Sequence, residues 1–170
     1  MIDMKPTTNS LMNSYLLNAE YDFESSNTEL PEELEKLLAN GFRTKQGCIL
    51  LKDFQYVGPG ELNTDFKKCE YEVFLNDIHV DDYFKHIKSE VEYLTIGLKL
   101  AKRLNKELRS RFDAKFRIIV SFYETTYSGE EVDTYGGCVV KFHQIRPSAE
   151  YAFKFSNLED FKSDAVMVIE

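Results

Sequence analysis

The chain has 170 residues, enough for one domain with its own hydrophobic core, and its apolar and charged fractions of 43% and 29% are those of an ordinary globular protein. A formal net charge of −8 argues against binding to nucleic acid or to an anionic membrane, because a negative chain repels phosphate at long range. No apolar run is long enough to cross a bilayer, and the polar first ten residues lack the apolar centre of a secretory signal, so we expect a cytoplasmic protein.

The first forty residues contain one clear element. Residues 1–28 favour neither helix nor strand and are interpreted as a peripheral segment. A short helix is predicted over residues 31–39, because Pro31 suits a first helical position and leucines recur on one face of the segment. Gly41 is typical of a helix end in the left-handed conformation.

Two strands are predicted next, over residues 47–57 and 66–75. The second alternates apolar Cys69, Tyr71, Val73 and Leu75 with charged residues, which is typical of a half-buried strand. We expect the two strands to pair as an antiparallel hairpin.

The firmest prediction is a long helix over residues 82–109. Apolar residues recur there at spacings of three, four and seven, in a stripe wide enough to cover a sheet. Asp81 or Asp82 is expected to cap the start of this helix.

The last sixty residues are predicted to form mainly strands. Residues 116–122 and 138–145 are predicted to form a second hairpin, joined by a polar, acidic connection. A strand at 151–155, a short helix near 157–163 capped by Asn157, and a strand at 165–169 complete the chain. The predicted fold is therefore α+β: a single domain with a mostly antiparallel sheet of about five strands, packed against one long helix at about 82–109.

The second hairpin carries the first candidate site. Its alternation places Cys138, Val140 and Phe142 toward the core and His143 on the outer face, where Tyr123 could lie across from it. Ile119, Val139 and Ile145 make the same outer face apolar, so either the N-terminal segment or a partner must cover it. Arg146 is expected to form a surface ion pair that contributes little energy.

A second candidate is the stretch Asp77, His79 and Asp81. Alternate positions of an extended segment share one side, and a histidine with two carboxylates can bind zinc or iron. The same residue types also form turns and helix caps, and that interpretation fits a connection between a strand and a helix.

Familiar catalytic motifs do not occur in the sequence. It contains no phosphate-binding loop, no nucleophile elbow and no His-Glu-x-x-His zinc motif. The three cysteines, Cys48, Cys69 and Cys138, lie in apolar stretches without a C-x-x-C pair, so they are interpreted as buried small hydrophobes. No cofactor is predicted.

Three functional hypotheses remain. The preferred one is a non-catalytic protein-binding module, in its most concrete form a bacterial inhibitor or immunity-type protein that blocks a basic toxin or nuclease. Its binding residues would be Glu130, Glu131 and Asp133 in the acidic connection, with Tyr123 and His143. The alternatives are a metal-dependent hydrolase that uses Asp77, His79 and Asp81, and a homo-oligomeric subunit whose outer sheet face pairs with a second copy.

Overall fold

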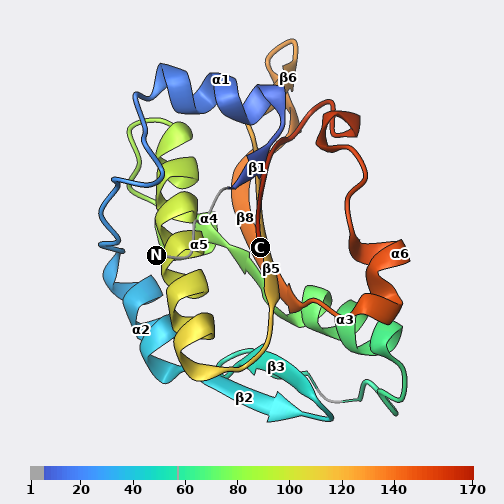
Figure 1. Ribbon diagram of the computed structural model, residues 1–170. Helices are drawn as coiled ribbons and strands as arrows, with labels where there is room; N and C mark the ends of the chain where they lie inside the picture. The colour runs from blue at the N-terminus through green and yellow to red at the C-terminus, as the bar shows by residue number, and fades with distance from the viewer. Residues whose placement is uncertain (1–5, 57) are drawn as a thin grey trace.

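A five-stranded antiparallel sheet forms the centre of the molecule. The computed structural model describes residues 6–56 and 58–170 (Figure 1). The strand order is β1-β9-β5-β8-β4, with bounds Thr7–Thr8, Ala165–Ile169, Phe116–Tyr123, Gly137–Gln144 and Asp77–His79. The predicted pairing of residues 116–122 with 138–145 is confirmed, since β5 and β8 are antiparallel partners from Phe116 opposite Gln144 to Tyr123 opposite Gly137. The α+β prediction is confirmed with it.

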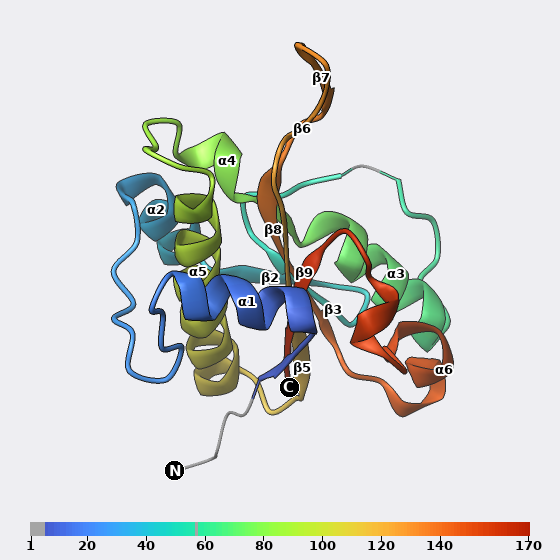
Figure 2. The same ribbon diagram turned by 90° about the horizontal axis from the view of Figure 1, so that it is seen from above.

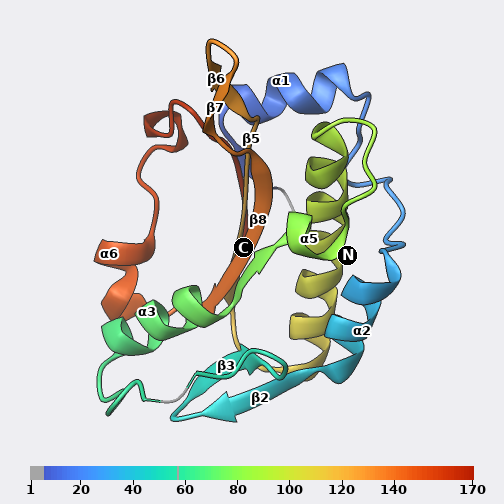
Figure 3. The same cartoon turned by 180° about the vertical axis from the view of Figure 1, so that it is seen from behind.

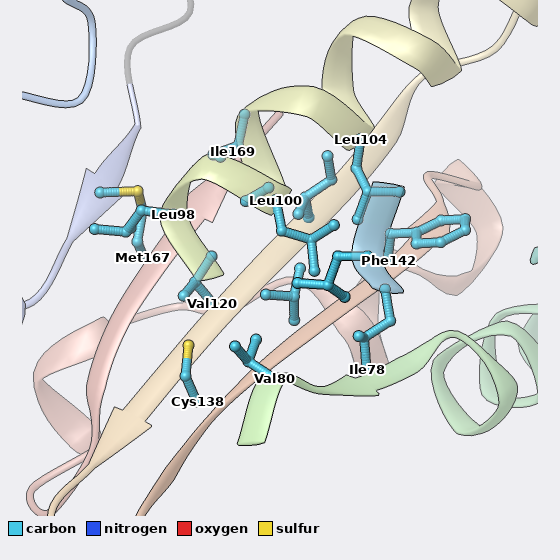
Figure 4. Close-up of a cluster of buried hydrophobic side chains, with 14 of the residues drawn as sticks. Ile78, Val80, Leu98, Leu100, Leu104, Val120, Cys138, Phe142, Met167 and Ile169 are labelled. Carbon is cyan, nitrogen blue, oxygen red and sulfur yellow. The ribbon is translucent and has the colours of Figure 1, made fainter. Parts of the chain in front are cut away.

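The long helix α5, Val91–Arg111, lies along one face of this sheet (Figure 1). Its leucines pack against the inward side chains of the strands, as Figure 4 shows. The predicted helix is therefore confirmed from residue 91, but its expected start is wrong. Residues 84–90 are not helical, and Asp81 and Asp82 belong to a separate short helix, α4, Val80–Tyr83, which follows His79. No helix within residues 6–56 and 58–170 has both the length and the apolar character needed to span a membrane.

The N-terminal segment is more firmly built into the fold than predicted. β1 pairs with β9, and helix α1, Ser10–Asn18, places Met12 in the main core. Asn9 joins the two parts: its side chain accepts hydrogen bonds from the amides of Met12 and Val166 at 2.9 and 3.0 Å. Helix α2, Glu32–Asn40, confirms the prediction for residues 31–39, and Gly41 follows it at φ 79°.

Residues 42–75 differ most from the predictions. Strands β2, Phe42–Lys45, and β3, Cys48–Leu51, form a separate hairpin, while residues 65–75 form helix α3, Asp65–Leu75. The predicted strand at 66–75 and its hairpin with 47–57 are therefore wrong. Thr64 caps α3 by accepting a hydrogen bond from the Lys67 amide at 3.2 Å.

The face of the sheet opposite α5 is covered by α3 and by residues 145–164, here called the C-terminal cover (Figures 1 and 3). The C-terminal cover contains the 3₁₀ turn η1, Pro147–Ala149, helix α6, Glu150–Phe153, and the 3₁₀ turn η2, Leu158–Asp160. Residues 151–155 are thus not the strand that alternation predicted. The helical turn after Asn157 is confirmed, because the Asn157 side chain accepts the Glu159 amide at 3.1 Å.

Candidate functional site

A two-stranded extension of the sheet projects from the body of the molecule. Beyond β5 and β8 the chain continues as β6, Thr126–Ser128, and β7, Glu131–Thr134, which pair with each other. We call residues 124–136 the finger. Every residue from 126 to 135 is exposed, and Figure 2 shows the finger standing clear of the helices.

The base of the finger is fixed by a small hydrogen-bond network. The carboxylate of Glu90, next to α5, accepts the Thr125 amide at 2.9 Å and also binds the Thr125 hydroxyl. That hydroxyl accepts the Gly136 amide at 3.0 Å. A side chain at Gly136 would overlap the backbone of Tyr123, Glu124 and Thr125, so glycine is required for this close approach. The base therefore holds the finger in one orientation.

The finger combines negative charge with exposed aromatic rings. It carries Glu124 and the predicted Glu130, Glu131 and Asp133, and no lysine or arginine occurs between Arg117 and Lys141. The rings belong to Tyr127 and Tyr135, which are 65% and 77% exposed. Tyr127 lies opposite Val132 across the hairpin, so one face of the finger presents an apolar pair.

The predicted site on the outer sheet face is not a surface site. His143 does lie on that face, but it is 1% exposed beneath the C-terminal cover. Tyr123 lies opposite Gly137, and the residue across from His143 is Arg117. Part of the apolar outer face is indeed covered, by the C-terminal cover rather than by the N-terminal segment: Leu158, Phe155 and Phe161 pack there with Ile119. Ile119 is therefore not free to pair with a second copy, and the homo-oligomer hypothesis stays a prediction.

A buried ion pair joins α3 to the end of β8. Arg146, predicted at the surface, is 6% exposed and binds both carboxylate oxygens of Glu72 at 2.8 and 2.9 Å. Glu72 is fully buried and also accepts the amides of Ile49 and Gln144 at 2.9 and 2.8 Å. Each oxygen of Glu72 thus has one amide and one guanidinium donor, so its charge is fully satisfied.

Asn76 extends this connection by one helical turn. Its oxygen accepts the Leu51 amide at 3.0 Å, and its nitrogen donates to the carbonyls of Ile49 and Phe142 at 2.9 and 3.3 Å. Glu72 and Asn76 therefore fill the gap between the edge of β3 and the edge of β8 with side-chain hydrogen bonds. The role of this network is structural, because its polar groups bind one another rather than facing a cavity.

The stretch Asp77, His79 and Asp81 does not converge on one point. Asp77 lies 3.5 Å from the His79 ring and 3.5 Å from the Lys141 ammonium group, while Asp81 lies beside Gly137. The helical turn of α4 ends the alternation after His79, which carries Asp81 away from the other two. Within the residues that the structure describes, no three His, Cys, Asp or Glu side chains are grouped to hold a metal ion.

The comparison with protein families gives one match. Residues 7–170 match the sequence model of the Uncharacterized protein PM0498 family, which covers nearly the whole chain. The chain belongs to this family. No curated protein and no solved structure matches it.

In this member of the family the cysteines are poor nucleophiles. Cys48, Cys69 and Cys138 are free and buried, as their apolar surroundings predicted. Burial raises the pKa of Cys48 to about 11 and raises the pKa values of Cys69 and Cys138. Since the thiolate is the reactive form, these side chains act as packing groups at neutral pH.

A hollow of about 650 Å³ lies between α3 and the loop that precedes it. Tyr56 and Phe74 form its aromatic walls, and its charged groups are Glu61, Lys67 and Glu70. No histidine or cysteine is among the residues that line it, and the charged side chains are exposed. The finger therefore remains the candidate site with the clearest chemistry.

Proposed function

We propose that this protein is a non-catalytic binding module of the cytoplasm, and that its finger engages a basic protein partner. The observation that carries the proposal is the finger itself. Its residues from 126 to 135 are all exposed, so their sequence is not explained by packing in the core. Acidic side chains and two exposed tyrosines on a fixed base are features suited to recognition.

The acidic side chains supply attraction and the tyrosines supply contact area. Charge complementarity steers a basic partner toward the finger and raises the association rate. Tyrosine is among the side chains that contribute most at protein interfaces, because its large ring is buried with little loss of conformational entropy. The anchored base lowers the ordering cost of binding further.

The most concrete form of this proposal is an inhibitor of immunity type. A toxin or nuclease that acts on nucleic acid has a basic active-site cleft, because it must bind phosphate. A narrow acidic projection with aromatic sides could enter such a cleft and exclude the substrate. This form is supported by the charge and shape of the finger.

Affinity capture with matched variants tests the proposal. The wild-type chain, tagged at its N-terminus, is compared with a finger variant that combines Glu130→Gln, Glu131→Gln and Asp133→Asn. The control combines Glu29→Gln, Glu61→Gln and Glu70→Gln, which removes the same charge from exposed positions elsewhere. Bound proteins are identified by mass spectrometry, and each is then purified for measurement of its association rate.

We expect a basic partner that binds the wild type and the control but associates about 10- to 100-fold more slowly with the finger variant at low salt. The difference should shrink as salt is raised, since screening acts on exposed charges. Equal association of all three proteins with every captured partner, or capture of no partner, would contradict the proposal.

A further inference from the structure

His143 is a histidine buried between the central sheet and the C-terminal cover. It is 1% exposed, it lies on β8 opposite Arg117 of β5, and the ring of Phe153 from α6 lies 5.5 Å from its own ring. Arg117 is also 1% exposed. Two nitrogen-rich side chains are thus buried next to each other under α6.

The hydrogen bonds of His143 determine which nitrogen carries the proton. Nδ1 lies 2.9 Å from the carbonyl oxygen of Gln144, and a carbonyl only accepts, so Nδ1 donates. The neutral ring then has its lone pair on Nε2. Within the described residues that atom is buried without a hydrogen-bond partner. A second proton would enter at Nε2, where no acceptor is in place.

The acceptors nearby are already used by arginines. Glu150 of α6 binds Arg117 at 3.0 and 2.7 Å, and Arg117 also donates to the carbonyl of Phe153 at 3.1 Å. Burial is the main cause that lowers the pKa of His143, and the charge of Arg117 lowers it further, while the hydrogen bond to the Gln144 carbonyl and the charges of Glu72 and Glu150 oppose this effect. The charged groups that act on the ring are Arg117 of β5, Glu72 of α3 and Glu150 of α6. The other charged or titratable groups of these elements bind elsewhere: Arg146 binds Glu72, Cys69 donates to the Gln144 carbonyl, Lys141 pairs with Asp77, and Lys154 acts on Glu150.

We propose that η1 and α6, residues 147–153, form an acid-labile flap that opens when His143 takes up a proton. The protonated ring repels Arg117 and competes with it for Glu150, which together with the Phe153 carbonyl ties α6 to Arg117 of the sheet. A hydrogen bond from Ser148 to Asp65 of α3 also holds residues 147–153 in place. Opening of residues 147–153 relieves both effects, because water can then solvate the imidazolium. The flap does not depend on the finger or on any partner.

The sign of the pH effect follows from linkage. The closed flap disfavours the proton on His143, whereas the open flap leaves the ring near its ordinary pKa of 6.5. The closed state therefore loses stability as pH falls below about 6.5. For a single proton the opening constant rises about tenfold per pH unit, until the pKa of His143 in the closed state is reached.

Amide hydrogen exchange on the whole protein tests the flap. The reporters are the amides of Ala149 and Lys154, which bond to the carbonyls of Arg146 and Glu150. Exchange is measured from pH 7.5 to 5.0 and corrected for the intrinsic pH dependence of exchange. We expect up to about tenfold weaker protection per pH unit below pH 6.5 in the wild type, and no such trend in His143→Gln. His86→Gln, which changes an exposed histidine, should behave like the wild type.

Protection that does not change with pH in the wild type, or the same acid trend in His143→Gln, would overturn the proposal. If His143→Gln does not fold, the wild-type ring is titrated by NMR instead. A pKa of His143 below 6.5, with the amides of residues 147–153 shifting in the same transition, supports the flap. A pKa at or above 6.5, or amides that do not follow the titration, refutes it.

Discussion

At the scale of single residues, the carboxylate of Glu72 shows how one charge can join three parts of the chain. It binds β3, the end of β8 and Arg146 while fully shielded from water. Removal of one partner from a buried ion pair lowers the free energy of unfolding far more than removal of one from an exposed pair. The reason is that the remaining charge stays buried without an opposite charge beside it.

The first prediction concerns Arg146→Met. We expect it to lower the free energy of unfolding by about 3–5 kcal/mol, because it leaves Glu72 buried with only two amide donors. Arg103→Met is the matched control: its partners Glu35 and Glu107 are both partly exposed and lie at 3.3 and 3.4 Å, so a loss of at most about 1 kcal/mol is expected. Urea unfolding measures both, and similar small losses in the two variants would show that the buried pair is not critical.

The contact between Gly97 and Cys138 gives a second residue-scale prediction. A side chain at position 97 would overlap the sulfur of Cys138, which packs against α5. Gly97→Ala should therefore destabilise the protein by about 1–3 kcal/mol, although alanine is the better helix former.

Cys138→Ala removes the overlapping sulfur and should rescue Gly97→Ala. We expect the double variant to be more stable than the sum of the two single losses predicts, by at least about 1 kcal/mol. Strictly additive losses in a thermal or urea unfolding cycle would contradict the packing described here.

At the scale of elements, the finger lies outside the hydrophobic core, and we predict that the rest of the protein folds without it. Its strands pair only with each other among the described residues, and the core clusters contain none of its side chains. Because Tyr123 lies opposite Gly137, a two-residue Asn-Gly turn can replace residues 124–136 and close the β5–β8 hairpin.

We expect this shortened protein to keep its circular dichroism spectrum and a free energy of unfolding within about 1–2 kcal/mol of the wild type, since it loses the Thr125–Glu90 network and the hydrogen bond between Glu124 and Tyr15 but no core side chain. It should fail to bind any partner that requires the finger. Loss of cooperative unfolding in the shortened protein would show that the finger has a role in folding instead.

Sequence patterns identified the elements whose partners are close in the chain, and missed those set by distant contacts. The β5–β8 hairpin, α2 and most of α5 follow from local periodicity. In α3 the apolar alternation of Cys69, Tyr71 and Leu75 imitated a strand. Glu72 alternated with these residues and was assigned to the polar face, but it is fully buried and binds Arg146, which lies 74 residues further along the chain. The cap at Thr64 was the local signal for a helix.

The negative charge of the finger could be predicted from the sequence, but its structure as a projecting two-stranded hairpin could not. Glu130, Glu131 and Asp133 could be selected from the sequence, because an acidic connection between two strands must lie at the surface. The β6–β7 pairing and its anchor at Glu90 could not, since both depend on contacts between segments. His143 was assigned to the correct sheet face, but its burial depends on the C-terminal cover, whose residues 151–155 alternation mistook for a strand.

At the scale of the whole molecule, acid should weaken the fold in two stages. In the first, the unfolded chain binds a proton at His143 more readily than the folded chain does, so stability falls below pH 6.5. In the second, at lower pH, protonation of the carboxylates that pair with arginines removes the stability that these ion pairs contribute. The hydrogen bond and charge of Arg117 hold the pKa of Glu150 below its ordinary 4.5, so the stability that this group contributes is present above pH 4.5 and is lost as pH falls further.

Urea unfolding midpoints between pH 8 and 3.5 separate the two stages. His143→Gln should remove the decline that begins near pH 6.5 and leave the later one. Glu150→Gln should lower the midpoint at neutral pH, where Arg117 loses an ionised partner, and its curve should approach that of the wild type below pH 4, because a protonated carboxyl resembles an amide. If the difference between the unfolding midpoints of Glu150→Gln and the wild type stays constant down to pH 3.5, the Arg117–Glu150 pair is not the cause of the loss of stability below pH 4.5.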